Sequence, residues 1–140
     1  MIPQRQGSIV LLSSLHSSMT YPARVPYSVT KAAIGGLTRA LAVEWGQYAI
    51  AVNAICPWQV RGERSQRFAD ALRDETGEDL FELYRQRSPM RRLVEPTEIA
   101  ETVLWLAKTP SVSGQEIILD GAVSASMWFR PFTEQASWSK

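Results

Sequence analysis

The sequence predicts an α/β fold in which about three parallel strands lie between layers of helices. Short aliphatic runs alternate along the chain with longer stretches of helical periodicity, and this alternation is typical of a parallel sheet with crossover helices. Of the 140 residues, 45% are hydrophobic and 21% are charged, which is typical of one soluble domain. We therefore predict a single domain over residues 1–140.

Three short segments are predicted strands: residues 9–12, 51–56 and 116–119. Each is a mainly aliphatic run flanked by residues that favour turns, which is typical of a strand buried on both faces. Pro57 is expected to end the second strand because proline has no N–H to donate to a sheet. The strands are expected to be parallel because a helical stretch separates each from the next.

The first predicted helix covers about residues 28–47. Ala33, Leu37, Leu41 and Trp45 recur there at helical spacing, so they are expected to form its apolar stripe. Small residues lie beside this stripe, so the predicted helix has two sides on which another element can pack closely.

The middle of the chain carries much of the charge. Residues 61–92 hold eight arginines and seven acids, with apolar residues at roughly helical intervals. Two short amphipathic helices broken near Gly77 are expected there. A further helix is predicted from Pro96 to about residue 110, because proline favours the first turn of a helix. The tail, residues 124–140, is short of aliphatic side chains but contains aromatic ones.

Composition excludes several classes of function. The net charge of +1 lacks the basic excess of proteins that bind nucleic acids, so no nucleic-acid partner is expected. The single cysteine, Cys56, is expected to be a small buried side chain, and the single histidine, His16, a loop residue, so we predict no disulfide and no metal site. No apolar run approaches the ~20 residues that span a bilayer, and no signal peptide is evident. We therefore expect no membrane partner and a cytoplasmic location.

Ser14, Tyr27 and Lys31 are the residues whose spacing suggests catalysis. Tyr27 and Lys31 are four residues apart at a predicted helix start, so they project from the same face. Ser14 comes just after the first strand, at the sheet edge where open α/β sheets bind ligands. A tyrosine hydroxyl ionises near pH ~10, and a nearby ammonium favours its phenolate, so the pair suits acid–base chemistry. The serine hydroxyl would orient a substrate oxygen toward the tyrosine.

A larger pattern around these residues resembles the short-chain dehydrogenase/reductase family. GSIVLLSS, with Ser14, is similar to the family's fifth strand and catalytic serine, and YSVTK, with Tyr27 and Lys31, is similar to its active-site helix. AVNAICP resembles the sixth strand, and PMRRLVEPTEIAETVLWLA and SGQEIILDG resemble the last helix and the last strand. The resemblance covers nearly all of residues 7–123. It implies the C-terminal half of such a protein, with a truncated Rossmann-like, three-layer fold.

The resemblance implies an oxidoreductase that uses NAD or NADP and acts on a secondary alcohol or a carbonyl of a small molecule. Tyr27 would be the general acid and base, and Ser14 would hold the substrate oxygen. Lys31 would tune the tyrosine and bind the ribose next to the nicotinamide. Pro57 and Val60 would lie beside the nicotinamide ring. The implied catalytic residues are therefore Ser14, Tyr27 and Lys31, and the implied cofactor residues are Tyr27, Lys31, Pro57 and Val60.

The family's glycine-rich phosphate turn is not found in this sequence. No two of the eight glycines form a Gly-x-Gly, so we expect the chain to lack the N-terminal dinucleotide-binding half. It is then inactive alone and needs a complementary segment or an oligomer to hold NAD or NADP. The alternative is a non-catalytic oligomeric binding or scaffold protein derived from such an enzyme. The resemblance implies that residues 61–95 form the helical segment that covers the substrate in the family, and the alternative is that this charged segment is simply surface.

A homo-oligomer is predicted for either function. The first strand has no predicted neighbour on one side, and an open apolar edge pairs readily with another chain. In the family, the helix after YSVTK packs against its twin in a partner subunit. Ala32, Gly35, Gly36 and Ala40 would permit such a close approach.

Overall fold

The computed structural model describes residues 1–126 and places three strands in one sheet. The strands are β1 (Gly7–Leu12), β2 (Ile50–Pro57) and β3 (Glu116–Leu119), in the spatial order β1-β2-β3. Both pairings, β1 with β2 and β2 with β3, are parallel. The predicted fold class is therefore confirmed. Most of the predicted aromatic tail, from residue 127 onward, lies outside the described residues.

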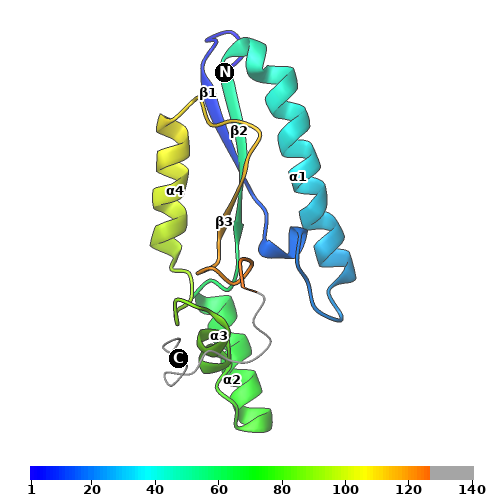
Figure 1. The fold of residues 1–140 in the computed structure, drawn as a ribbon, viewed down its shortest axis with the longest axis vertical. Coiled ribbons are helices and arrows are strands. Elements are labelled where there is room, and N and C mark those ends of the chain that lie inside the picture. The colour runs from blue at the N-terminus through cyan, green and yellow to red at the C-terminus, as the bar shows by residue number, and fades with distance from the viewer. Residues whose placement is uncertain (127–140) are drawn as a thin grey trace, which may run out of the picture. The chain divides into compact units, whose positions relative to one another are not determined.

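Helices flank the two faces of this sheet (Figure 1). The helix α1 (Val25–Trp45) runs along one face and α4 (Pro96–Lys108) runs along the other. α1 begins slightly before the predicted start, since Pro26 lies within its first turn, where proline is favoured. Among residues 1–126, no helix has the length and apolar character needed to span a membrane.

The described residues divide into two compact units. The first unit comprises Met1–Trp58 and Thr97–Leu119, and it therefore contains the sheet, α1 and nearly all of α4. The second unit comprises Gln59–Pro96 and, among the described residues, 120–126. Each unit is described separately below.

The strand β2 forms the centre of the first unit. All of its residues, from Ile50 to Pro57, are buried. The buried amide of Asn53 donates from Nδ2 to the carbonyl of Val112 at 2.7 Å and accepts from the N–H of Gln115 at 3.1 Å. Because both ends of this amide are hydrogen-bonded, burying it carries little penalty. Asn53 therefore fixes the loop that leads into β3.

Gly35 allows α1 to approach β3 closely. It is buried, and the carboxylate of Glu116, the first residue of β3, lies directly against it. Arg39 donates from Nη1 to Glu116 Oε1 at 2.8 Å, and Cys56 Sγ lies 3.7 Å from Glu116 Oε2. Gly35 is thus explained by packing within one chain. The other small residues predicted for close helix approach are exposed: Ala32, Gly36 and Ala40.

The second unit contains the two predicted amphipathic helices, α2 (Glu63–Thr76) and α3 (Leu80–Arg87). Gly77 ends α2 with a φ of 77°, a left-handed conformation that favours glycine. Asp79 begins α3, because its carboxylate accepts hydrogen bonds from two backbone N–H groups of the first turn. The predicted break near Gly77 is therefore confirmed.

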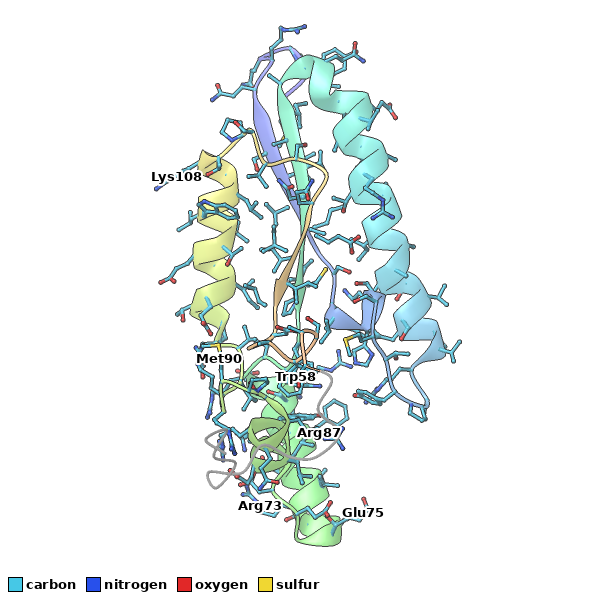
Figure 2. All side chains as sticks on the ribbon, in the orientation of Figure 1. Trp58, Arg73, Glu75, Arg87, Met90 and Lys108 are labelled. Carbon is cyan, nitrogen blue, oxygen red and sulfur yellow. The ribbon has the colours of Figure 1, made fainter. Side chains whose placement is uncertain are left out.

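The second unit has a small core with charged groups around it. Ala69, Phe81 and Leu93 are buried together. Charged side chains extend outward from α2, as Figure 2 shows for Arg73 and Glu75. The high charge of this segment is therefore carried on its surface, as expected for amphipathic helices.

Gly35→Ala and Gly46→Ala are expected to have different effects on stability. Space is open at Gly46, which ends α1 with helical backbone angles, so alanine there should raise the free energy of unfolding by up to about 1 kcal/mol through helix propensity. A Cβ at Gly35 would displace the Glu116 carboxylate and disturb its bond to Arg39, so Gly35→Ala should leave that free energy within about 0.5 kcal/mol of the wild-type value. Urea unfolding followed by circular dichroism measures both values. Equal effects would contradict the packing of α1 on β3.

Candidate active site

Ser14 lies just beyond the carboxyl end of β1 and is buried. Its extended backbone, with φ −164° and ψ 159°, begins the 3-10 turn Leu15–Ser17. The Oγ accepts a hydrogen bond from the N–H of His16 at 3.2 Å. A hydroxyl has two lone pairs and one proton, so this bond leaves one lone pair and the proton for other hydrogen bonds.

Two hydrogen bonds tie Lys31 to the residues next to Ser14. The Nζ of Lys31 donates to the carbonyl of Leu12 at 2.9 Å, and the Oγ of Ser13 donates to the carbonyl of Lys31 at 3.0 Å. We name these two bonds the Lys31 clamp, since they join α1 to the end of β1 through both the side chain and the backbone of one residue. An ammonium has three N–H donors, so Lys31 keeps two for other groups.

Tyr27 lies in the first turn of α1 with 42% of its surface exposed. The Nζ of Lys31 is 5.6 Å from the centroid of its ring, as the four-residue spacing predicts. The imidazole of His16 packs edge-on against the same ring, with centroids 5.4 Å apart and an interplanar angle of 78°. Ser14, Tyr27 and Lys31 are therefore linked in one cluster through His16 and Leu12.

His16 lies at the centre of a small aromatic cluster. Its imidazole also packs against Tyr21, with centroids 4.8 Å apart, and its Nδ1 lies 3.0 Å from Oγ1 of Thr20. Burial, and then the positive charge of Arg24, hold the pKa of His16 below its ordinary value of 6.5. The imidazole is therefore neutral at pH 7, and it adds no charge beside Tyr27.

Cys56 lies on β2 just before Pro57, close to the site but outside the reacting groups. Burial raises the pKa of its thiol, although hydrogen bonds from Ser13 and Ser17 act in the opposite direction. Reactive cysteines need an environment that favours the thiolate. Cys56 therefore acts as a small buried side chain.

The remaining predicted cofactor residues are at or after the end of β2. Pro57 is the last residue of β2, and because the strands are parallel it lies at the same sheet edge as Ser14. Val60 belongs to the second unit, where it pairs with Val94 in an isolated parallel bridge. Three of the four predicted cofactor residues are therefore in the first unit.

Sequence reasoning missed two parts of this arrangement. His16, which the sequence indicates only as a loop residue, contacts the ring of Tyr27. Ser13 forms half of the Lys31 clamp. A signal for Ser13 was present, since two consecutive serines follow the first strand. Ser14 caps the 3-10 turn Leu15–Ser17, and Ser13 bonds the Lys31 carbonyl on α1.

A family comparison agrees with this geometry. Residues 1–124 match the model described as Enoyl-(Acyl carrier protein) reductase, which represents short-chain dehydrogenases/reductases. The chain belongs to the short-chain dehydrogenase/reductase family. The match confirms the predicted resemblance to the C-terminal part of such proteins.

Individual relatives extend this finding. Oxidoreductase UcpA from Escherichia coli is 40% identical over 124 residues, which cover 86% of this chain and 47% of UcpA. A short chain dehydrogenase family protein from Francisella tularensis has a TM-score of 0.80 at 28% identity, over 85% of this chain and 51% of its own. A gluconate 5-dehydrogenase from Burkholderia cenocepacia, solved with NADP and tartrate, has a TM-score of 0.77 at 25% identity, over 90% of this chain and 48% of its own. The chain thus spans about half the length of the curated relatives it matches.

Arg24→Gln is expected to raise the pKa of His16, because it removes a positive charge that disfavours the imidazolium. Arg5→Gln is the matched control, since Arg5 bonds the carbonyl of Gln47 beyond the other end of α1, and it should leave this pKa unchanged. His16 is the only histidine, so an NMR titration of its imidazole resonance reads the value directly. The same pKa in the wild type and Arg24→Gln would contradict the electrostatic contact.

Proposed function

We propose that this chain carries the reacting groups of a short-chain dehydrogenase/reductase site, which interconverts a secondary alcohol and a carbonyl of a small molecule with NAD or NADP. The observation that carries the proposal is the Lys31 clamp, together with the ring of Tyr27 beside the Lys31 ammonium. Membership of the family supports it. Ser14, Tyr27 and Lys31 are the proposed catalytic residues.

Tyr27 is the proposed general acid and base. In oxidation, its phenolate would take the hydroxyl proton of the alcohol, and a bound nicotinamide would supply the acceptor for the hydride that leaves the carbon. The Lys31 ammonium lies 5.6 Å from the centroid of the Tyr27 ring, so the two side chains are placed to act on one substrate. Ser14 donates from its free hydroxyl proton to the substrate oxygen and orients it toward Tyr27. In reduction, the Tyr27 hydroxyl gives its proton to the oxygen of the new alcohol.

The residues of this chain suit one end of a nicotinamide dinucleotide. Lys31 keeps two N–H donors for ribose hydroxyls, and Pro57, which is buried, lies at the same sheet edge. When bound, the nicotinamide supplies the acceptor or donor of the hydride. The sequence has no Gly-x-Gly, so N–H donors for the pyrophosphate would come from another segment of polypeptide.

A non-catalytic oligomeric binding or scaffold protein is the second candidate, and the outer face of α1 favours it. Small or β-branched residues recur at helical spacing along this face and are exposed: Val25, Val29, Ala32, Gly36, Ala40 and Val43. Val43 is 85% exposed. A continuous apolar stripe in water is typical of a protein interface. Both candidates therefore include a homo-oligomer in which α1 packs against a second copy.

The proposed cofactor site predicts weak binding that depends on Lys31. The chain should bind NADPH and reduced nicotinamide mononucleotide with affinities within about tenfold of each other, because its residues meet only the nicotinamide ribose end. Lys31→Ala should abolish both, whereas Lys108→Ala, at the end of α4 (Figure 2), should abolish neither. Nicotinamide fluorescence measures binding, and circular dichroism checks that each variant is folded. No saturation of the folded wild type at millimolar NADPH would reject the proposal.

Light scattering tests the proposed homo-oligomer. The wild type should have the mass of at least two chains at micromolar concentration. Ala40→Glu places a charge within the exposed stripe of α1 and should give the mass of one chain. Phe68→Glu, at an exposed apolar residue of α2, is the matched control and should leave the mass unchanged. A monomeric wild type would contradict this part of the proposal.

A further inference from the structure

The geometry points to Arg24 as the residue that binds a carboxylate of the substrate on which Ser14, Tyr27 and Lys31 act. This inference rests on the proposed function and deepens it, because it assigns the substrate to the class of anionic alcohols and carbonyl compounds. Arg24 directly precedes α1 and stands three residues before Tyr27.

Contacts between rings connect Arg24 to the reacting hydroxyl. The guanidinium lies over the ring of Tyr21, with Cζ 5.2 Å from its centroid. Tyr21 packs against His16, and His16 packs against Tyr27. His16 also bonds the Oγ of Ser14 through its N–H. Arg24 therefore belongs to the same cluster of side chains as the proposed catalytic residues.

The part of the chain that builds this cluster carries only positive charge. The first acidic residue in the sequence is Glu44, near the other end of α1. Arg39 on α1 is already paired with Glu116. Among residues 1–126, the Arg24 guanidinium forms no hydrogen bond or ion pair, and its contact with Tyr21 leaves its N–H donors available. Arg24 and Lys31 have no acidic partner within the part of the chain that the structure describes, so these two cations attract anions to the site.

The arrangement also separates the anionic group from the reacting group. The planar fork of an arginine matches the two oxygens of a carboxylate. A carboxylate directly beside Tyr27 would oppose formation of the phenolate, since like charges disfavour each other. Arg24 contacts Tyr21, which is connected to Tyr27 through His16, so a carboxylate on Arg24 need not contact Tyr27 directly. The lowered pKa of His16 agrees with this placement, because Arg24 is one of its causes.

Phosphate groups of the cofactor are the other source of negative charge near such a site, and arginine binds them as well. The substrate is the occupant favoured here, because Arg24 is joined through rings to the hydroxyls of Ser14 and Tyr27, which act on the substrate in the proposed function. A phosphate probe therefore forms a separate arm of the test.

The single histidine makes a direct binding experiment possible. The full chain is titrated with D-gluconate and with uncharged D-sorbitol at pH 7 and constant ionic strength, while NMR follows the His16 imidazole resonance. Gluconate should shift this resonance in a saturable way, and sorbitol should need at least about tenfold higher concentration. Arg24→Gln should remove the preference for gluconate, and Arg5→Gln, which changes the charge equally, should retain it.

An unmoved His16 resonance in the wild type with gluconate, or an unchanged preference in folded Arg24→Gln, would overturn the inference. Adenosine 2′,5′-bisphosphate is the phosphate probe, and a shift that depends on Arg24 with this probe but not with gluconate would assign Arg24 to the cofactor and overturn it as well. The titrations contain no nicotinamide. The NADPH binding experiment is therefore independent of these titrations. A failure to bind NADPH would reject the proposed function, whereas a failure to bind gluconate would reject only the role of Arg24.

Discussion

The Lys31 clamp is the contact on which the arrangement of the proposed catalytic residues depends. It joins one residue of α1, by its side chain and its backbone, to the two residues that precede Ser14. The N–H of Ser13 in turn bonds the carbonyl of Ile55 at 2.8 Å, so the clamp is anchored on the central strand β2. The same contact also sets the position of Tyr27, since Tyr27 lies one helical turn before Lys31 on α1. A hydrogen bond donated by an ammonium is stronger than one between two neutral groups. The bond from Lys31 to the Leu12 carbonyl is therefore suited to holding the exposed start of α1 in place.

Parallel pairing makes this contact possible. Because β1 and β2 run in the same direction, Ser14 and Pro57 lie at the same edge of the sheet. The helix α1 follows β1 and precedes β2 in the chain, so it must run back along the face of the sheet in the opposite direction. Gly35 then lets α1 settle against the Glu116 carboxylate of β3, where Arg39 holds it. The same helix therefore connects all three strands. The chemistry proposed for its first turn depends on packing that extends along its length.

Local sequence patterns predicted the helices and strands, but they could not predict contacts between residues that are far apart in the sequence. The strands, the break at Gly77 and the start of α4 at Pro96 follow from residue type and periodicity. The apolar stripe predicted for α1 was partly wrong, because Ala33 and Leu37 are exposed while Gly35 and Thr38 are buried. That helix has small or apolar residues on two sides, and the side that packs is set by contacts with β2 and with Glu116, both distant in the sequence from most of the helix. Ser14, Tyr27 and Lys31 were predicted by spacing and family resemblance, but the partners that hold them were not.

The central claim is that this chain by itself holds the reacting groups together. The most direct test is a two-dimensional NOE spectrum of the folded wild type at pH 7, without any nucleotide. The ring protons of His16 should show cross-peaks to the ring protons of Tyr27, because the two rings pack edge to face with centroids 5.4 Å apart. A folded chain in which His16 shows no cross-peak to Tyr27 would contradict the account.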